Sequence, residues 1–91
     1  MSFGRRRERR LGPCVITYHA LDSYLNRVPG VTVHSARLQI QRLACRAVWH
    51  HSTWSGCEAY RAGDVELVAQ RVARRPPVVT TIIFRGGSTN A

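Results

Sequence analysis

His19 has neighbours with which it could transfer protons and hold a phosphate group. Asp22 and Asn26 follow it by three and seven residues, so in a helix they share its face, and Arg27 flanks that face. At the second position of a helix the macrodipole disfavours a positive charge, so the imidazole is expected to stay neutral and to serve as a base. The same spacing also fits an ordinary surface histidine near a helix start.

A second group of polar side chains follows the strands expected in the C-terminal half. Thr81 and Arg85 share one face of the last expected strand, because side chains alternate along a strand. Glu58 and Tyr60 share a face of an earlier strand, and Arg61 points the other way. On a concave sheet such a set could hold a scissile phosphate, with arginine stabilising the developing charge. The alternative is that these residues only solvate the edge of the sheet.

The charge balance points to a polyanionic partner. Fourteen basic residues, all of them arginine, face five acidic ones, which gives a net charge of +9. A phosphate backbone is the commonest partner of such a surface, and an anionic membrane is the alternative. The residues expected to bind nucleic acid are Arg5, Arg6, Arg7, Arg9, Arg10, Tyr60, Arg61, Arg74 and Arg75.

Other chemistries are disfavoured. His50, His51 and Cys57, with His34 or Cys45, do not have the spacing of a tetrahedral zinc site, so we expect no metal and no cofactor. The sequence contains no glycine-rich phosphate loop, no nucleophile elbow and no pair of catalytic carboxylates. The arginines of the second expected helix do not belong to a helix-turn-helix motif, because strands follow that helix.

Hydrophobic periodicity predicts the elements that must position these residues. The expected order is a short strand at 14–16, a helix at 18–28 capped by Thr17, a helix from Thr32 or Ser35 to Trp49, a polar loop at 50–56, and strands at 58–62, 65–73 and 78–85. The predicted fold class is α+β, with a short N-terminal strand and two helices packed on a three- to four-stranded antiparallel sheet. The other face of the sheet would be left for a ligand.

The length of 91 residues suits a single domain with one modest core. We expect a flexible basic arm at 1–12, the α+β domain at 13–86 and a disordered tail at 87–91. Three cysteines form no paired framework, and neither a leader nor an apolar run of about 18 residues is visible. These features predict a cytoplasmic protein that is not embedded in a membrane.

Two segments resemble a known group of proteins. The stretch from Ile16 to Val28, ITYHALDSYLNRV, resembles the opening of small phage and actinobacterial proteins that look related to the RelE-like ribonuclease toxins, the barnase–colicin–RelE class. The ending from Val78 to Arg85, VVTTIIFR, is similar to their final strand. Ser23 departs from the pattern, which often has arginine there.

The resemblance implies metal-independent cleavage of RNA, in which the 2′-hydroxyl attacks the adjacent phosphate. The residues that match the motif positions, and that the resemblance makes catalytic, are His19, Arg27, Thr81 and Arg85. It further implies RNA as the partner, together with a cognate antitoxin or a host protein. The alternative is a non-catalytic phage accessory protein that binds nucleic acid or inhibits a host protein through the same basic surface.

Overall fold

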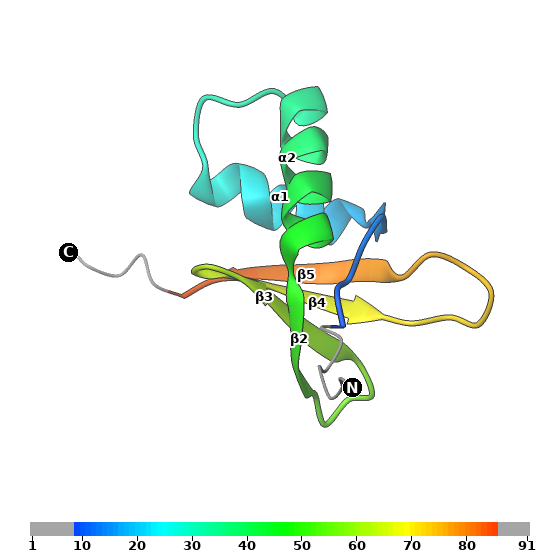
Figure 1. Ribbon diagram of the computed structural model, residues 1–91. Helices are drawn as coiled ribbons and strands as arrows, with labels where there is room; N and C mark the ends of the chain where they lie inside the picture. Colours follow the sequence, from blue (N-terminus) through cyan, green and yellow to red (C-terminus); the bar gives the residue numbers. More distant parts are fainter. Residues whose placement is uncertain (1–8, 86–91) are drawn as a thin grey trace, which may run out of the picture.

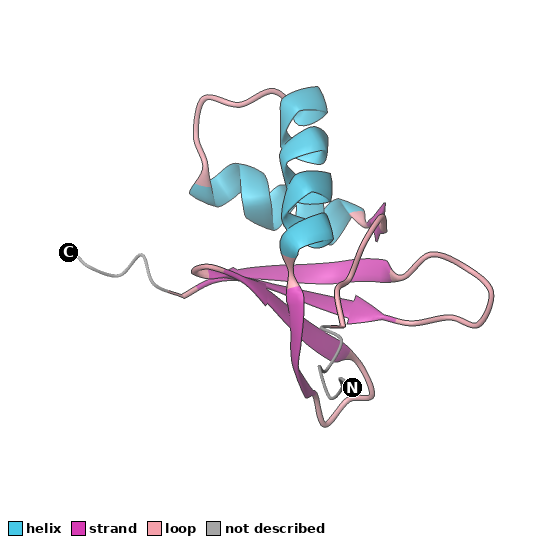
Figure 2. Ribbon diagram, in the orientation of Figure 1, coloured by secondary structure: helices cyan, strands magenta, loops and turns pink. Residues whose placement is uncertain are grey.

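The computed structural model describes residues 9–85. The elements are β1 (Val15–Ile16), α1 (Tyr18–Arg27), α2 (Val33–Arg46), β2 (Val48–Ser52), β3 (Glu58–Ala62), β4 (Val65–Gln70) and β5 (Val78–Phe84). Figure 1 shows both helices on one side of a single twisted sheet, and Figure 2 shows the same two layers by element type. The predicted α+β class is confirmed.

Both helices begin at the threonines that the sequence favoured as caps. The Thr17 hydroxyl accepts a hydrogen bond from the Ala20 amide at 3.2 Å, and the Thr32 hydroxyl accepts one from the Ser35 amide at 3.0 Å. The second helix ends at Arg46, three residues earlier than expected. Its C-cap Ala47 is extended, and Val48 and Trp49 after it pair with β3 as part of a strand.

The sheet has five strands in the order β1-β5-β4-β3-β2, so the expectation of three to four was too low. The additional strand is β2, which contains the residues His50 and His51 that were expected in a polar loop. A strand at the edge of a sheet tolerates polar side chains, because one of its sides faces solvent. The sheet is also mixed rather than antiparallel, since β1 pairs in parallel with β5 while the other neighbours are antiparallel.

The domain begins earlier than the predicted boundary at residue 13. Leu11 is buried in the core, and its amide donates to the Ala47 carbonyl at 3.0 Å. Arg10 forms an antiparallel bridge with Val48, and the Trp49 amide donates to the Arg9 carbonyl at 2.7 Å. Residues 9–12 therefore belong to the folded domain rather than to a flexible arm, because the free edge of β2 supplies them with backbone partners.

The core lies between the helices and one face of the sheet. Its largest fully buried side chains are Ile40 from α2 and Tyr60, Leu67 and Val79 from the sheet. The sequence analysis expected one face of the sheet to be left without helices, and Figure 2 shows that neither helix packs on that face. The alternation of side chains along β3, β4 and β5 thus separates a helix-side face from an open face.

Candidate nucleic-acid interface

Three segments distant in sequence meet at one end of the sheet. The strand register pairs Ser52 with Glu58 and Glu58 with Ala69, and Gln70 with Val78, so the β2–β3 hairpin and the β4–β5 turn lie at the same end. The Arg9 side chain reaches the same region from the N-terminal segment, because its guanidinium lies against the Trp49 ring. Five side chains form what we call the sheet-end cluster: Arg9, Trp49, Glu58, Tyr60 and Arg71.

Two arginines of this cluster stack on aromatic rings. The guanidinium carbon of Arg9 lies 5.0 Å from the centre of the Trp49 ring. That of Arg71 lies 5.7 Å from the centre of the Tyr60 ring, and the Arg71 Nε donates to the Tyr60 hydroxyl at 3.0 Å. Stacking holds a guanidinium in place while its N–H edge can still bind an anion. The sheet end therefore carries two positioned cations.

Glu58 is the acidic member of the cluster. Its carboxylate accepts hydrogen bonds from the Trp49 indole and, at 3.1 Å, from the Ser52 hydroxyl. The indole hydrogen bond is the main cause of a lowered Glu58 pKa, and the Ser52 hydroxyl and the charges of Arg9 and Arg71 lower it further. Glu58 is thus an ionised, half-buried carboxylate beside two cations.

The surroundings of the cluster add positive charge. Arg10 is exposed beside Arg9, and the β4–β5 turn exposes Arg74 and Arg75. Arg74 has a positive φ of 63°, a conformation that is uncommon for residues other than glycine. At this end of the described chain, four arginines, Arg9, Arg71, Arg74 and Arg75, therefore accompany one glutamate. Such a concentration of one sign raises the local concentration of anionic ligands.

The structure does not gather the four residues that the resemblance made catalytic. His19 is exposed in the first turn of α1, in a shallow depression of about 320 Å³ lined by α1 residues alone. Arg27 is in the last turn, about 12 Å farther along the helix axis at 1.5 Å per residue. Its guanidinium lies 5.1 Å from the centre of the Phe84 ring. Within residues 9–85, His19 makes no hydrogen bond with Thr81 or Arg85.

Thr81 and Arg85 belong to the open face and to the far end of β5. Thr81 pairs with Val68, and the Arg85 Nε donates to Glu66 at 2.8 Å. Arg61 donates to the same carboxylate oxygen at 3.1 Å, while Glu66 itself is 2% exposed. Burial alone would raise the Glu66 pKa, but the hydrogen bonds and charges of Arg85 and Arg61 outweigh it and lower that pKa. This triad ties two of the predicted phosphate-binding arginines, whose own side chains are 37% and 51% exposed, to a buried carboxylate.

The remaining predicted binding residues have different positions. Tyr60 is fully buried beneath Arg71, so it supports that arginine instead of offering its own hydroxyl. Arg5, Arg6 and Arg7 lie outside the described residues. Arg9 reaches the cluster, as does Glu58, which the sequence had placed on one face with Tyr60, and Arg71, which the sequence prediction omitted. The alternation of Leu67, Ala69 and Arg71 was the signal that would have placed Arg71 on the helix-side face.

The histidines of β2 form a pair rather than a metal centre. A β-bulge between Trp49 and His51 brings the Nδ1 atoms of His50 and His51 to 2.8 Å from each other. Across residues 9–85, no three histidine, cysteine or acidic side chains come together in a way that could hold a metal ion. In the same part of the chain, neither helix is long and apolar enough to cross a membrane.

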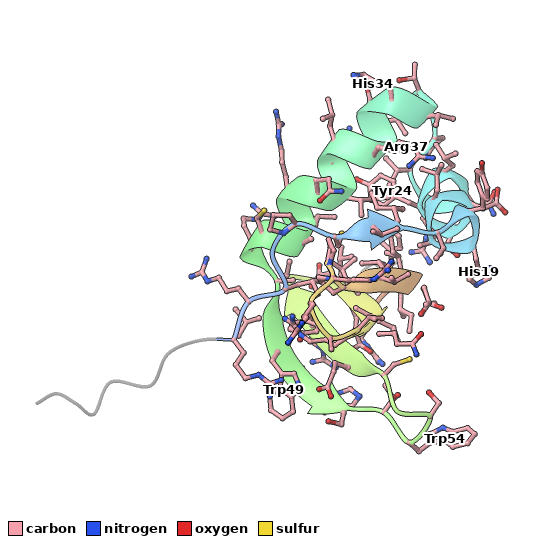
Figure 3. All side chains as sticks on the ribbon, turned by 90° about the vertical axis from the view of Figure 1, so that its right-hand side faces the viewer. His19, Tyr24, His34, Arg37, Trp49 and Trp54 are labelled. Atoms are coloured by element: carbon pink, nitrogen blue, oxygen red, sulfur yellow. The ribbon has the colours of Figure 1, made fainter. Side chains whose placement is uncertain are left out.

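Comparison of the chain with protein-family models, with curated proteins and with solved structures found no match. The chemistry of the sheet end is therefore interpreted from its own geometry. Figure 3 shows Trp49 and Trp54 at the end of the molecule that lies away from the helices, with His34 and Arg37 at the opposite end.

Proposed function

We propose that the protein binds RNA at the sheet end. The observation that carries the proposal is the pair of arginines stacked on Trp49 and Tyr60, at the end of the sheet where Arg74 and Arg75 are also exposed. Arginine binds phosphate oxygens through its planar N–H fork, and a stacked guanidinium loses little freedom when it does so. The overall charge of +9 adds long-range attraction for the same ligand.

The test is direct binding of a labelled RNA oligomer at several salt concentrations. Because each neutralised phosphate releases counterions, affinity should fall steeply as salt increases. The double variant Arg9→Ala, Arg71→Ala should bind more weakly and with a shallower salt dependence. A matched double variant, Arg37→Ala with Arg42→Ala, removes two exposed arginines from α2 and should change affinity much less. Equal losses in both double variants would show that only total charge matters.

Glu58 favours a second candidate function, metal-independent cleavage of the bound RNA. The Glu58 carboxylate is ionised beside the two arginines, so it is placed to accept a proton, and its lowered pKa makes it a weak base. As a general base it would accept the proton of the 2′-hydroxyl while O2′ bonds to phosphorus and the bond to the 5′-oxygen breaks. The 5′-oxygen takes a proton from water or from the protonated Glu58, and a 2′,3′-cyclic phosphate remains. The arginines would stabilise the charge that develops on the phosphate.

Two variants separate this candidate from the site that the resemblance implies. Glu58→Gln keeps the shape of the cluster and should lower the cleavage rate by about 10²-fold or more, while RNA affinity stays equal or increases. His19→Ala should leave cleavage unchanged, whereas it should abolish cleavage if the helix histidine is the base. A matched 2′-deoxy oligomer must not be cut in either case, because it lacks the nucleophile. Binding without any cleavage would leave RNA binding as the function.

A cytoplasmic location agrees with the proposal. All three cysteines, Cys14, Cys45 and Cys57, are free thiols, as is usual in a reducing compartment. Burial is the main cause of the raised pKa of the Cys14 thiol, about 11, so this cysteine stays protonated in the core.

A further inference from the structure

We propose that Trp54 stacks on an unpaired base, so that the RNA bound at the sheet end is single-stranded. This inference rests on the proposed RNA-binding function and specifies its substrate class. Trp54 is 99% exposed at the tip of the β2–β3 hairpin, although tryptophan carries the largest apolar surface of any side chain. Figure 3 shows the indole extending outward from the tip, away from the sheet.

The hairpin tip is a built structure that holds the tryptophan outward. The Thr53 amide donates to the Cys57 carbonyl at 2.8 Å, and the Cys57 amide donates to the Thr53 hydroxyl at 3.0 Å. The Gly56 amide donates to the Thr53 carbonyl at 3.1 Å. Gly56 has a φ of 90°, which glycine adopts without steric cost. Because the turn is closed by its own hydrogen bonds, the ring is presented in place and loses little freedom when a ligand covers it.

The tip lies next to the phosphate-binding arginines. Ser52 and Glu58 are paired across the hairpin, and Trp54 follows Ser52 by two residues, which is about 7 Å of extended chain. Ser52 also donates a hydrogen bond to Glu58 of the sheet-end cluster at 3.1 Å, so the hairpin tip begins at that cluster. A strand whose phosphate lies on Arg9 or Arg71 would thus bring a nearby base to the indole.

The chemistry around Trp54 favours a base over a membrane or a protein partner. The flanking residues Thr53, Ser55 and Gly56 are polar or lack a side chain, so the indole is a single apolar ring and not part of a patch. A membrane-binding tip or a protein interface needs several contiguous apolar side chains. One ring beside a cluster of arginines can hold a single strand, since every base has a face that stacks and the backbone is bound by charge.

The experiment compares a labelled single-stranded RNA oligomer with the perfectly paired duplex of the same sequence, using the full chain. Trp54→Ala should weaken single-strand binding by about 5- to 100-fold, the range for loss of one stacked base, and should change duplex binding by less than about threefold. Trp54→Phe retains a stacking ring and should recover most of the loss. Tyr18→Ala removes another exposed aromatic side chain, 84% exposed on α1, and should change neither affinity.

Several outcomes would overturn the inference. It fails if Trp54→Ala binds the single strand as tightly as Tyr18→Ala does, or if it weakens duplex binding to the same extent. It also fails if the substitution leaves RNA binding intact but releases the protein from vesicles of phosphatidylserine and phosphatidylcholine. If any of these results is obtained but the Arg9→Ala, Arg71→Ala variant loses RNA affinity, the proposed RNA binding stands and only the stacking of Trp54 on a base is excluded. If that variant also binds normally, the proposed function itself fails.

Discussion

The sheet contains two places where a glutamate lies between two arginines, and they differ in burial. On the open face, Glu66 is 2% exposed and accepts hydrogen bonds from both Arg61 and Arg85. At the sheet end, Glu58 is half-buried and takes its hydrogen bonds from neutral donors, Trp49 and Ser52. The first arrangement joins both arginines to one carboxylate by direct salt bridges, whereas the second leaves its arginines stacked on aromatic rings.

This difference separates a structural ion triad from a ligand site built of the same residue types. A guanidinium has five N–H donors, and Arg71 uses one of them on Tyr60. Its charge is not cancelled by a direct salt bridge, so a phosphate can still gain from it. Arg61 and Arg85 also use one N–H each, but they donate it to a carboxylate whose charge offsets part of theirs, so a phosphate gains less from them. Arginine count alone therefore does not identify the phosphate-binding surface.

The largest expected effect distinguishes the two pairs by RNA binding. Replacing Arg9 and Arg71 by alanine should lower RNA affinity by about 10²-fold, since each charge-assisted hydrogen bond contributes about 1.5–3 kcal/mol. The logarithmic salt slope should fall by about 1.4, or 0.7 for each lost phosphate contact on a single strand. The Arg61→Ala, Arg85→Ala variant should lose less than threefold. Titration of each double variant with labelled RNA measures both losses, and circular dichroism confirms that the variants are folded. A larger loss of affinity in Arg61→Ala, Arg85→Ala than in Arg9→Ala, Arg71→Ala would contradict the comparison.

The next effect concerns the free energy of unfolding. Glu66→Gln should reduce it by about 1–3 kcal/mol, because a buried amide cannot satisfy both arginines and two charge-assisted hydrogen bonds are lost. Glu58→Gln should reduce it by less than about 1 kcal/mol, as is usual for a solvated surface group. Urea denaturation of both variants beside the unaltered protein provides the measurement. Equal losses would mean that Glu58 is as structural as Glu66.

The elements that were predicted correctly are those whose signals are local. Thr17 and Thr32 cap their helices through residues three positions later, and Gly63 allows the β3–β4 turn with a φ of 61°. The β2 strand was missed because the pairing that defines it comes from β3 and from the segment around Arg10. A strand at an edge takes its stability from those neighbours and needs no apolar alternation of its own.

The candidate site was only partly predictable for the same reason. Alternation placed Glu58 and Tyr60 on one face, and the charge of the N-terminal segment pointed to Arg9. The contact between Arg9 and Trp49 joins residues 40 positions apart, and no local pattern encodes it. The pairing of Arg85 with Glu66 likewise depends on the register of β4 and β5, which decides whether an arginine is engaged inside the protein or available.

A smaller effect appears in the pH dependence of stability. The folded-state pKa of Glu66 is lowered, so its contribution is present above its unfolded pKa of about 4.3 and is lost as pH falls through the folded value. Unfolding free energy should therefore decline in acid, and less steeply in Glu66→Gln. The contribution of Glu66 to stability should persist in about 0.5 M salt, because buried pairs are screened little. Of the contribution of Glu58, the share that comes from the charges of Arg9 and Arg71 should shrink, while the share from the Trp49 hydrogen bond should remain. Denaturation series at two ionic strengths test this, and equal salt sensitivity of the two contributions would contradict it.

The smallest effect tests whether stacking matters beyond charge. Arg71→Lys keeps the positive charge but loses the planar fork, the contact with the Tyr60 ring and the Nε hydrogen bond to its hydroxyl. A cation–π contact at an exposed site contributes about 0.5–1 kcal/mol, so RNA affinity should fall by about two- to fivefold. The salt slope should stay unchanged, because a lysine at this position still displaces one counterion. Arg61→Lys is the matched control on the open face, and it should leave both affinity and slope as they are.

If Arg71→Lys binds RNA as weakly as Arg71→Ala, the guanidinium geometry is decisive and charge alone contributes little. If it binds as tightly as the unaltered protein, the ring contact does not organise the site, and the two glutamate regions differ only in burial.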